Sequence, residues 1–117
     1  MSEFKNKIAL VTGAGEGIGR ATAVALSIKG AKVIVTDINL TSGEKTVEEI
    51  LSNGGKAVFY KLDVSKSEEI EKVIHNIFDK EGSIDFAVNN AGVGGKFDGI
   101  HNLDMKDWSN TININIT

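Results

Sequence analysis

Four glycines within seven positions are the clearest chemical signal in the sequence, and they follow an apolar run that ends at Thr12. Glycine adopts positive φ and has no Cβ, so a strand-to-helix turn made of glycines lets a phosphate approach the backbone. The helix that follows would direct unpaired N–H groups and its positive dipole end toward that phosphate. The pattern is Thr-Gly-x-x-x-Gly-x-Gly, made by Thr12, Gly13, Gly17 and Gly19, with Gly15 inside it. Both a GxxxxGK[ST] loop and a GxGxxG fingerprint are excluded, because Ile18 stands where each needs a glycine.

Asp37 is the second candidate for nucleotide chemistry. It ends the apolar run "KVIVTD" and follows Gly19 by 18 residues, a position from which a carboxylate can accept from both hydroxyls of an adenine ribose. The alternative is an ordinary turn or helix N-cap aspartate, since "DINLTS" precedes a predicted helix. A 2′-phosphate would require a nearby cation, and the two best-placed positions, Glu16 and Ile38, are not basic. The sequence therefore favours NAD over NADP.

The segments around these residues alternate between strand and helix patterns. Short β-branched runs predict strands at 8–12, 32–37, 57–63 and 85–90, and their near-continuous apolarity is typical of strands buried on both faces. "NGG" at 53–55 predicts the end of the second helix, and Ser65 with Glu68 forms a capping box for the third. The apolar stripes expected to face the sheet are Ile18, Ala21, Ala25 and Ile28 in the first helix; Val47, Ile50 and Leu51 in the second; and Ile70, Val73, Ile74, Ile77 and Phe78 in the third.

This alternation predicts an α/β fold, a three-layer doubly wound parallel sheet with helices on both faces. Ligands of such sheets bind at the carboxyl ends of the strands. Four predicted strand ends carry polar or glycine-rich residues, at 12–19, at Asp37, at Asp63 and at 89–92. Their convergence at one edge is a stronger signal than the glycine motif alone.

Composition narrows the function classes. The 117 residues allow one domain, with 41% hydrophobic and 25% charged residues, as in ordinary globular proteins. A net charge of −3 argues against nucleic acid or an anionic membrane as partner. Without cysteine there is no disulfide or thiolate metal site, and the two histidines form no metal motif, so no metal is expected. No export signal or long apolar segment stands out, and a cytoplasmic location is expected.

With these motifs in their observed order, the whole chain resembles the short-chain dehydrogenase/reductase family. The resemblance implies a partial Rossmann-type domain over 1–117 with strand order 3-2-1-4. It also implies that Asp37 binds the ribose, that the Asp63-Val64 pair binds adenine, and that Asn89-Asn90-Ala91-Gly92 lines the cofactor. The implied cofactor contacts are Gly13, Gly15, Glu16, Gly17, Ile18, Gly19, Asp37, Asp63, Val64, Asn90, Ala91 and Gly92. Asn115, seven residues after Trp108, falls at the position of the family's catalytic asparagine, on a long helix.

The sequence departs from the family in its catalytic residues. The family's general acid/base is the tyrosine of Tyr-x-x-x-Lys, beyond the asparagine, together with a serine. Here the only tyrosine is Tyr60, and the residue four positions later is Val64. We therefore expect a truncated, catalytically inactive NAD-binding part of an enzyme that moves hydride between nicotinamide and an alcohol or ketone. The alternatives are a non-catalytic nucleotide-binding or self-assembling module, and half of a split enzyme.

The resemblance also predicts an interface. If the sheet ends at its fourth strand, "DFAVNN" presents an apolar edge with unpaired backbone groups. Such an edge pairs readily with another chain. We expect a homodimer joined through this strand or through the final helix.

Overall fold

The computed structural model describes residues 3–90 and 112–115. Strands and helices alternate through residue 89, as the sequence pattern predicts. The elements are β1 (Ile8–Thr12), α1 (Gly17–Ile28), β2 (Lys32–Asp37), α2 (Leu40–Ser52), β3 (Lys56–Lys61), α3 (Ser67–Glu81), β4 (Phe86–Asn89) and β5 (Ile112–Asn115). Among these helices the longest is α3 with 15 residues, and none has the length and apolarity to cross a membrane.

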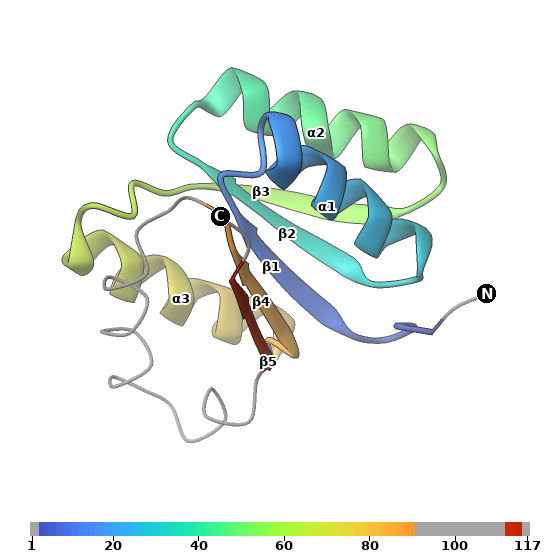
Figure 1. The fold of residues 1–117 in the computed structure, drawn as a ribbon. Coiled ribbons are helices and arrows are strands. Elements are labelled where there is room, and N and C mark those ends of the chain that lie inside the picture. The colour runs from blue at the N-terminus through green and yellow to red at the C-terminus, as the bar shows by residue number, and fades with distance from the viewer. Residues whose placement is uncertain (1–2, 91–111, 116–117) are drawn as a thin grey trace.

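All strand pairs are parallel, and the sheet order is β3-β2-β1-β4-β5. The predicted order 3-2-1-4 is confirmed, with β5 added beside β4. Figure 1 shows α1 and α2 on one face of the sheet and α3 on the other, so the fold has the three predicted layers. In a parallel sheet of this kind the loops after the strands gather at one edge.

Neighbouring residues of the central strands pack on opposite faces, which explains their unbroken apolarity. Leu10 and Ile34 belong to the cluster under α3, whereas Val11, Val33 and Val35 belong to the cluster under α1 and α2. The predicted stripe of α3 is confirmed, with four fully or nearly buried residues, Ile70, Val73, Ile74 and Ile77, and Phe78 packed at its margin.

The predicted core face of α1 is wrong. Ile18 and Ile28 are 60% and 67% exposed, and the buried residues are instead Gly19, Ala23 and Ser27. These small residues recur every fourth position, so their face can approach the sheet more closely than a face of isoleucines could. In α2, Ile50 is buried as predicted, but Leu51 is 53% exposed.

Local signals predicted one helix end correctly and one helix start incorrectly. α2 ends at "NGG", where Gly54 has φ +83° and the Gly55 N–H donates to the Ile50 carbonyl. α3 begins at Ser67 after Lys66, which makes no side-chain cap hydrogen bond, so the Ser65–Glu68 capping box is wrong. The Ser65 hydroxyl donates to the Asp63 carboxylate instead.

The carboxyl-terminal segment also differs from the prediction. Asn115 lies in strand β5 and not in a helix, paired in parallel with β4 at the register Asn89↔Asn115. The sequence "ININ" places β-branched residues at every second position, which suits a strand. β4 is consequently not the edge of the sheet, and Val88 within it is 2% exposed in the core under α1 and α2.

Gly43, in the first half of α2, is a test of how tightly this helix packs on β3. A Cβ at this position would overlap the Phe59 ring. Alanine for glycine inside a helix ordinarily stabilises by about 1 kcal/mol. We expect Gly43→Ala to destabilise by about 1–3 kcal/mol instead, because overpacking outweighs helix propensity. Urea unfolding measures the change.

The control is Gly43→Ala combined with Phe59→Leu, which removes the ring and should recover part of the loss relative to Phe59→Leu alone. A Gly43→Ala protein as stable as the parent would show that Phe59 can move aside freely.

Candidate nucleotide-binding site

The glycine loop runs from the end of β1 to the start of α1, and its glycines are required by close contacts. A Cβ at Gly19 would overlap the Gly13 carbonyl and the Asn90 side-chain amide, and Gly17 has φ +57°. Glu16, the residue before α1, makes no side-chain cap hydrogen bond, so the first turn of the helix carries no capping side chain. Backbone N–H groups at such a helix start can bind a phosphate.

Asp37 lies against this loop. Its Oδ2 accepts from the Gly15 N–H at 2.8 Å, and its Oδ1 accepts from the Asn39 N–H at 2.9 Å. The N-cap of α2 is Asn39, whose side chain accepts from the Ser42 N–H, so Asp37 is not the N-cap. It makes a turn with Asn39 and also joins the end of β2 to the glycine loop.

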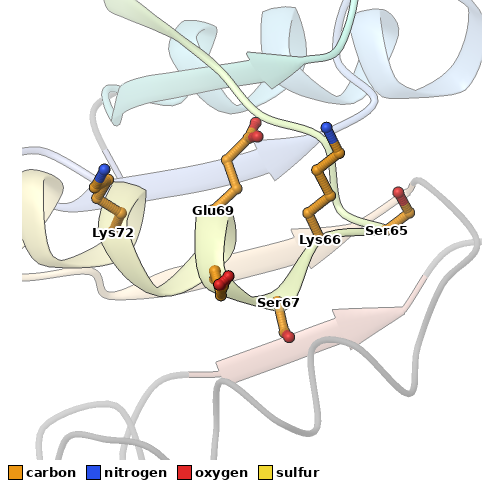
Figure 2. Close-up of a pocket in the computed structure, with 6 residues that line it drawn as sticks. Ser65, Lys66, Ser67, Glu69 and Lys72 are labelled. Carbon is orange, nitrogen blue, oxygen red and sulfur yellow. The ribbon is translucent and has the colours of Figure 1, made fainter.

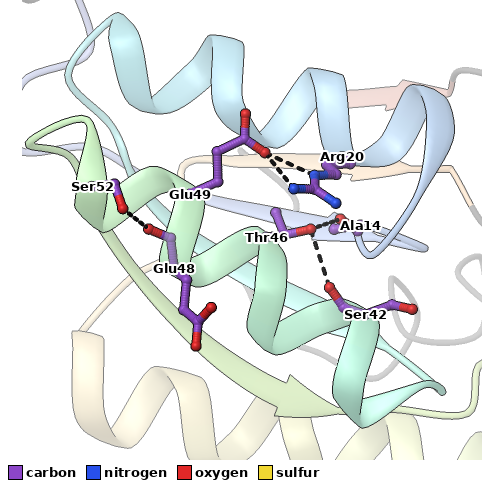
Figure 3. Close-up of polar contacts among 7 residues, drawn as sticks. All are labelled: Ala14, Arg20, Ser42, Thr46, Glu48, Glu49 and Ser52. Carbon is purple, nitrogen blue, oxygen red and sulfur yellow. Dashed lines mark hydrogen bonds and ion pairs between the residues drawn. The ribbon is translucent and has the colours of Figure 1, made fainter.

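The loop is held from α2 as well, through residues that the sequence analysis missed. The Thr46 hydroxyl donates to the Ala14 carbonyl at 2.8 Å, as Figure 3 shows, and the Ser42 hydroxyl donates to the Glu16 carboxylate at 3.3 Å. Ala14 N–H donates to the Thr36 carbonyl at 3.0 Å. The sequence could have indicated this role, because Thr46 lies on the buried face of an amphipathic helix and a buried hydroxyl needs a hydrogen-bond partner.

The end of β4 closes the other side of the loop. The Asn90 N–H donates to the Thr12 hydroxyl at 3.0 Å, and the Asn90 side-chain amide donates to the Gly13 carbonyl at 3.2 Å. The Thr12 hydroxyl donates to Asn89 Oδ1 at 3.2 Å. Residues 12–19 and 89–90 therefore form one hydrogen-bonded unit, whereas the predicted contacts Ala91 and Gly92 lie outside the described residues.

Asp63 and Val64 follow β3 at the same edge of the sheet. The Leu62 N–H donates to the Asp37 carbonyl at 3.0 Å, which joins the two strand ends. Val64 packs against the core under α3. The Asp63 carboxylate accepts from the Ser65 hydroxyl at 2.6 Å and from its N–H at 2.9 Å. These two bonds hold the pKa of Asp63 below its ordinary value.

Beyond Asp63, the start of α3 borders an open hollow of about 730 Å³. Figure 2 shows its lining side chains, which are charged or hydroxylic: Ser65, Lys66, Ser67, Glu68, Glu69 and Lys72. Glu69 is engaged there, because its carboxylate accepts from the Asp63 N–H at 2.9 Å. None of the predicted cofactor contacts within residues 3–90 lines this hollow.

The Ser65 contacts generate a pH prediction. Ser65→Ala removes the hydroxyl donor, so the pKa of Asp63 should rise toward its ordinary value of 3.8. A lowered carboxyl pKa stabilises the fold above the unfolded-state pKa, and that contribution is lost as pH falls through the folded-state pKa. In Ser65→Ala the contribution of Asp63 is smaller. NMR titration of the Asp63 carboxyl carbon measures the pKa.

Ser67→Ala is the matched control, since Ser67 begins α3 and makes no hydrogen bond to Asp63 in the described residues. An Asp63 pKa that is equal in the parent and in Ser65→Ala would mean that the Ser65 hydroxyl does not lower the pKa.

Comparison with known proteins identifies the family that shares this sequence and fold. The chain is 37% identical over 115 residues to a cyclohexanol dehydrogenase of Acinetobacter sp. (strain SE19), covering 98% of this chain and 46% of that protein. Among solved structures it is similar to an NAD+-bound xylitol dehydrogenase, with TM-score 0.74, 37% identity, and coverage of 77% of this chain and 35% of that one. A metagenomic short-chain oxidoreductase in complex with NADP gives TM-score 0.75 and 36% identity, with coverage of 77% and 41%.

The chain thus spans less than half the length of these relatives, which as a family bind NAD or NADP. The family model described as short chain dehydrogenase matches residues 7–117, nearly the whole sequence. The glycine loop, the strand order and this match agree, and the chain belongs to the short-chain dehydrogenase family.

Proposed function

We propose that this chain is the NAD-binding part of an oxidoreductase that moves hydride between nicotinamide and an alcohol or ketone. The observation that carries the proposal is the Asp37 carboxylate, held against Gly15 N–H at the mouth of the glycine loop. The loop would hold the pyrophosphate, Asp37 the adenine ribose, and Asp63 with Val64 the adenine. The loop fits such a group, since a Cβ at Gly17 would face open space and no side chain caps the start of α1. NAD, when bound, supplies the hydride acceptor.

The preference for NAD rests on charge. Asp37 and Glu16 both lie beside the loop, and Ser42 donates to Glu16 at 3.3 Å, which keeps that carboxylate near the start of α2. Two carboxylates would repel a ribose 2′-phosphate. Arg20, the only arginine in the sequence, pairs with Glu49 of α2 at 2.8 Å instead of pointing to this position.

The proton-transfer groups would have to come from elsewhere. Tyr60 lies in β3, packs beside the core under α3, and has the Lys80 ammonium 6.0 Å from its ring centre. It lacks a lysine four residues later and is not the tyrosine that the family's chemistry uses. We infer that this chain by itself binds the cofactor without turning over substrate, and that Asn115 contributes to catalysis only within a complete site.

A second function would use the same contacts of the glycine loop and Asp37 without hydride transfer. In that case the chain is a non-catalytic nucleotide-binding or self-assembling module, and Asp37 serves binding alone. Half of a split enzyme, completed by a second polypeptide, is the third possibility. Adding that second half in trans separates the third from the second, since only a split enzyme would regain turnover.

Asp37→Ala tests the proposed cofactor. Hydrogen bonds to a charged group contribute about 1.5–3 kcal/mol, so NAD binding should weaken about ten- to a hundredfold. NADP binding should stay equal or tighten, because a repulsive charge has been removed. Isothermal titration calorimetry with each cofactor measures both constants.

Glu44→Gln is the matched control, since it removes one exposed carboxylate from α2 on the side of Val58 and Phe59 of β3. Unchanged affinities for both cofactors in Asp37→Ala would refute the ribose assignment, and no binding of either by the parent chain would refute the proposed cofactor function.

We still propose self-association, but through a different surface from the β4 edge expected from the sequence. β4 is paired with β5, so the outer edge of β5 takes the place of the β4 edge, while the opposite edge strand β3 begins and ends with the exposed lysines Lys56 and Lys61. Lysine on an edge strand opposes pairing. The cytoplasmic location expected from the sequence also stays a prediction.

Asn113→Lys should therefore shift a dimer toward monomer in size-exclusion chromatography with light scattering, whereas Glu44→Lys should not. If Asn113→Lys leaves the dimer intact, β5 is not the interface.

A further inference from the structure

One peptide group of the glycine loop is held at both of its polar atoms. The Ala14 carbonyl accepts from the Thr46 hydroxyl at 2.8 Å, and the N–H of the same peptide, on Gly15, donates to Asp37 Oδ2 at 2.8 Å. The first bond comes from the middle of α2 and the second from the end of β2. Rotating this peptide would break both bonds at once.

Because it is buried, the hydrogen bond from Thr46 to the Ala14 carbonyl would be costly to lose. Thr46 and Ala14 are both fully buried. The Thr46 hydroxyl also lies 3.4 Å from the Ser42 carbonyl one turn earlier, a much longer contact than the one to Ala14 (Figure 3). A buried carbonyl that loses its donor pays the full desolvation penalty, so removing the hydroxyl favours any rearrangement that brings the Ala14 carbonyl another partner.

The surrounding contacts limit what else could orient this peptide. Ala14 N–H is bonded to the Thr36 carbonyl, which anchors the preceding peptide to β2. On the far side, Gly15 lies close to the Ser42 side chain, and a Cβ there would be 2.7 Å from Ser42 Cβ. Among the described residues, Thr46 is the side chain that bonds the Ala14 carbonyl.

We propose that Thr46 is a positioning residue for ribose recognition: it holds the Ala14–Gly15 peptide so that the Gly15 N–H orients the Asp37 carboxylate. The inference rests on the proposed function, in which Asp37 binds the ribose. Thr46 itself touches no cofactor. Its effect reaches the ligand through one peptide and one carboxylate, so it should change ribose selectivity more than general nucleotide affinity.

ADP and 2′-deoxy-ADP are suitable probes, because they differ only in the 2′-hydroxyl, one of the two ribose hydroxyls that Asp37 would bind. The comparison uses the full 117-residue chain as the parent, with Thr46→Val, which is similar in shape and lacks the hydroxyl, and Thr46→Ser, which restores it. The measured quantity is the ratio of the 2′-deoxy-ADP dissociation constant to the ADP dissociation constant.

The parent and Thr46→Ser should share one ratio, and Thr46→Val should lower it about two- to tenfold, the effect of one hydrogen bond. In an Asp37→Asn background, Thr46→Val should leave the ratio unchanged, since the two residues act in series. A merely structural role would weaken both nucleotides equally, and an unchanged ratio in Thr46→Val would overturn the proposal.

A second measurement needs no ligand and separates this inference from the proposed function. Amide hydrogen exchange of the Gly15 N–H, followed by NMR in the free chain, should be about two- to tenfold faster in Thr46→Val than in the parent and Thr46→Ser. Unchanged Gly15 exchange refutes the positioning role even if ADP does not bind. Failure of the parent to bind ADP, with faster Gly15 exchange in Thr46→Val, refutes only the ribose function.

Discussion

Close approach of backbone segments at the carboxyl edge of the sheet is the constraint on which the rest of this structure depends. Parallel strands end at the same edge, so the segments that follow β1, β2 and β4 must pack against one another. Gly19 lies so near the Gly13 carbonyl and the Asn90 amide that no side chain fits between them. The same absence of side chains would let a phosphate approach the backbone at the start of α1.

Buried threonine hydroxyls keep these closely packed segments in register. Thr36 donates to the Val11 carbonyl at 2.9 Å, Thr46 donates to the Ala14 carbonyl, and Thr12 bridges Asn89 and the Asn90 N–H. Each hydroxyl satisfies a polar group at the point where a strand passes into a loop. Because an unpaired buried carbonyl is costly, these bonds favour one loop conformation over its alternatives before any ligand arrives.

Charge is divided between structural pairs and the candidate site. Arg20 pairs with Glu49 across α1 and α2, and Lys32 pairs with Glu81 across β2 and α3, each at 2.8 Å. Both pairs are partly exposed and so contribute modestly to stability. In both pairs the cation is bound by a glutamate of a helix. The carboxylate of Asp37 is instead held by backbone N–H groups at the loop. Carboxylates beside the loop can accept from free ribose hydroxyls, whereas the N–H groups at the start of α1 can bind phosphates.

The sequence by itself predicted β1 to β4, the glycine loop and the place of Asp37 at the end of β2, because apolar periodicity and turn chemistry are local properties. The strand order was predicted from the family resemblance. Only the tertiary structure decided which face of α1 is buried, since the close approach of Gly19 to Gly13 overrides the isoleucine stripe. It also decided that Ser65 bonds Asp63 in place of capping α3, and that Asn115 pairs beside β4. The hydrogen bond of Thr46 to Ala14 could not be predicted from the sequence. The two residues are 32 positions apart, and partners at that separation produce no periodic sequence pattern.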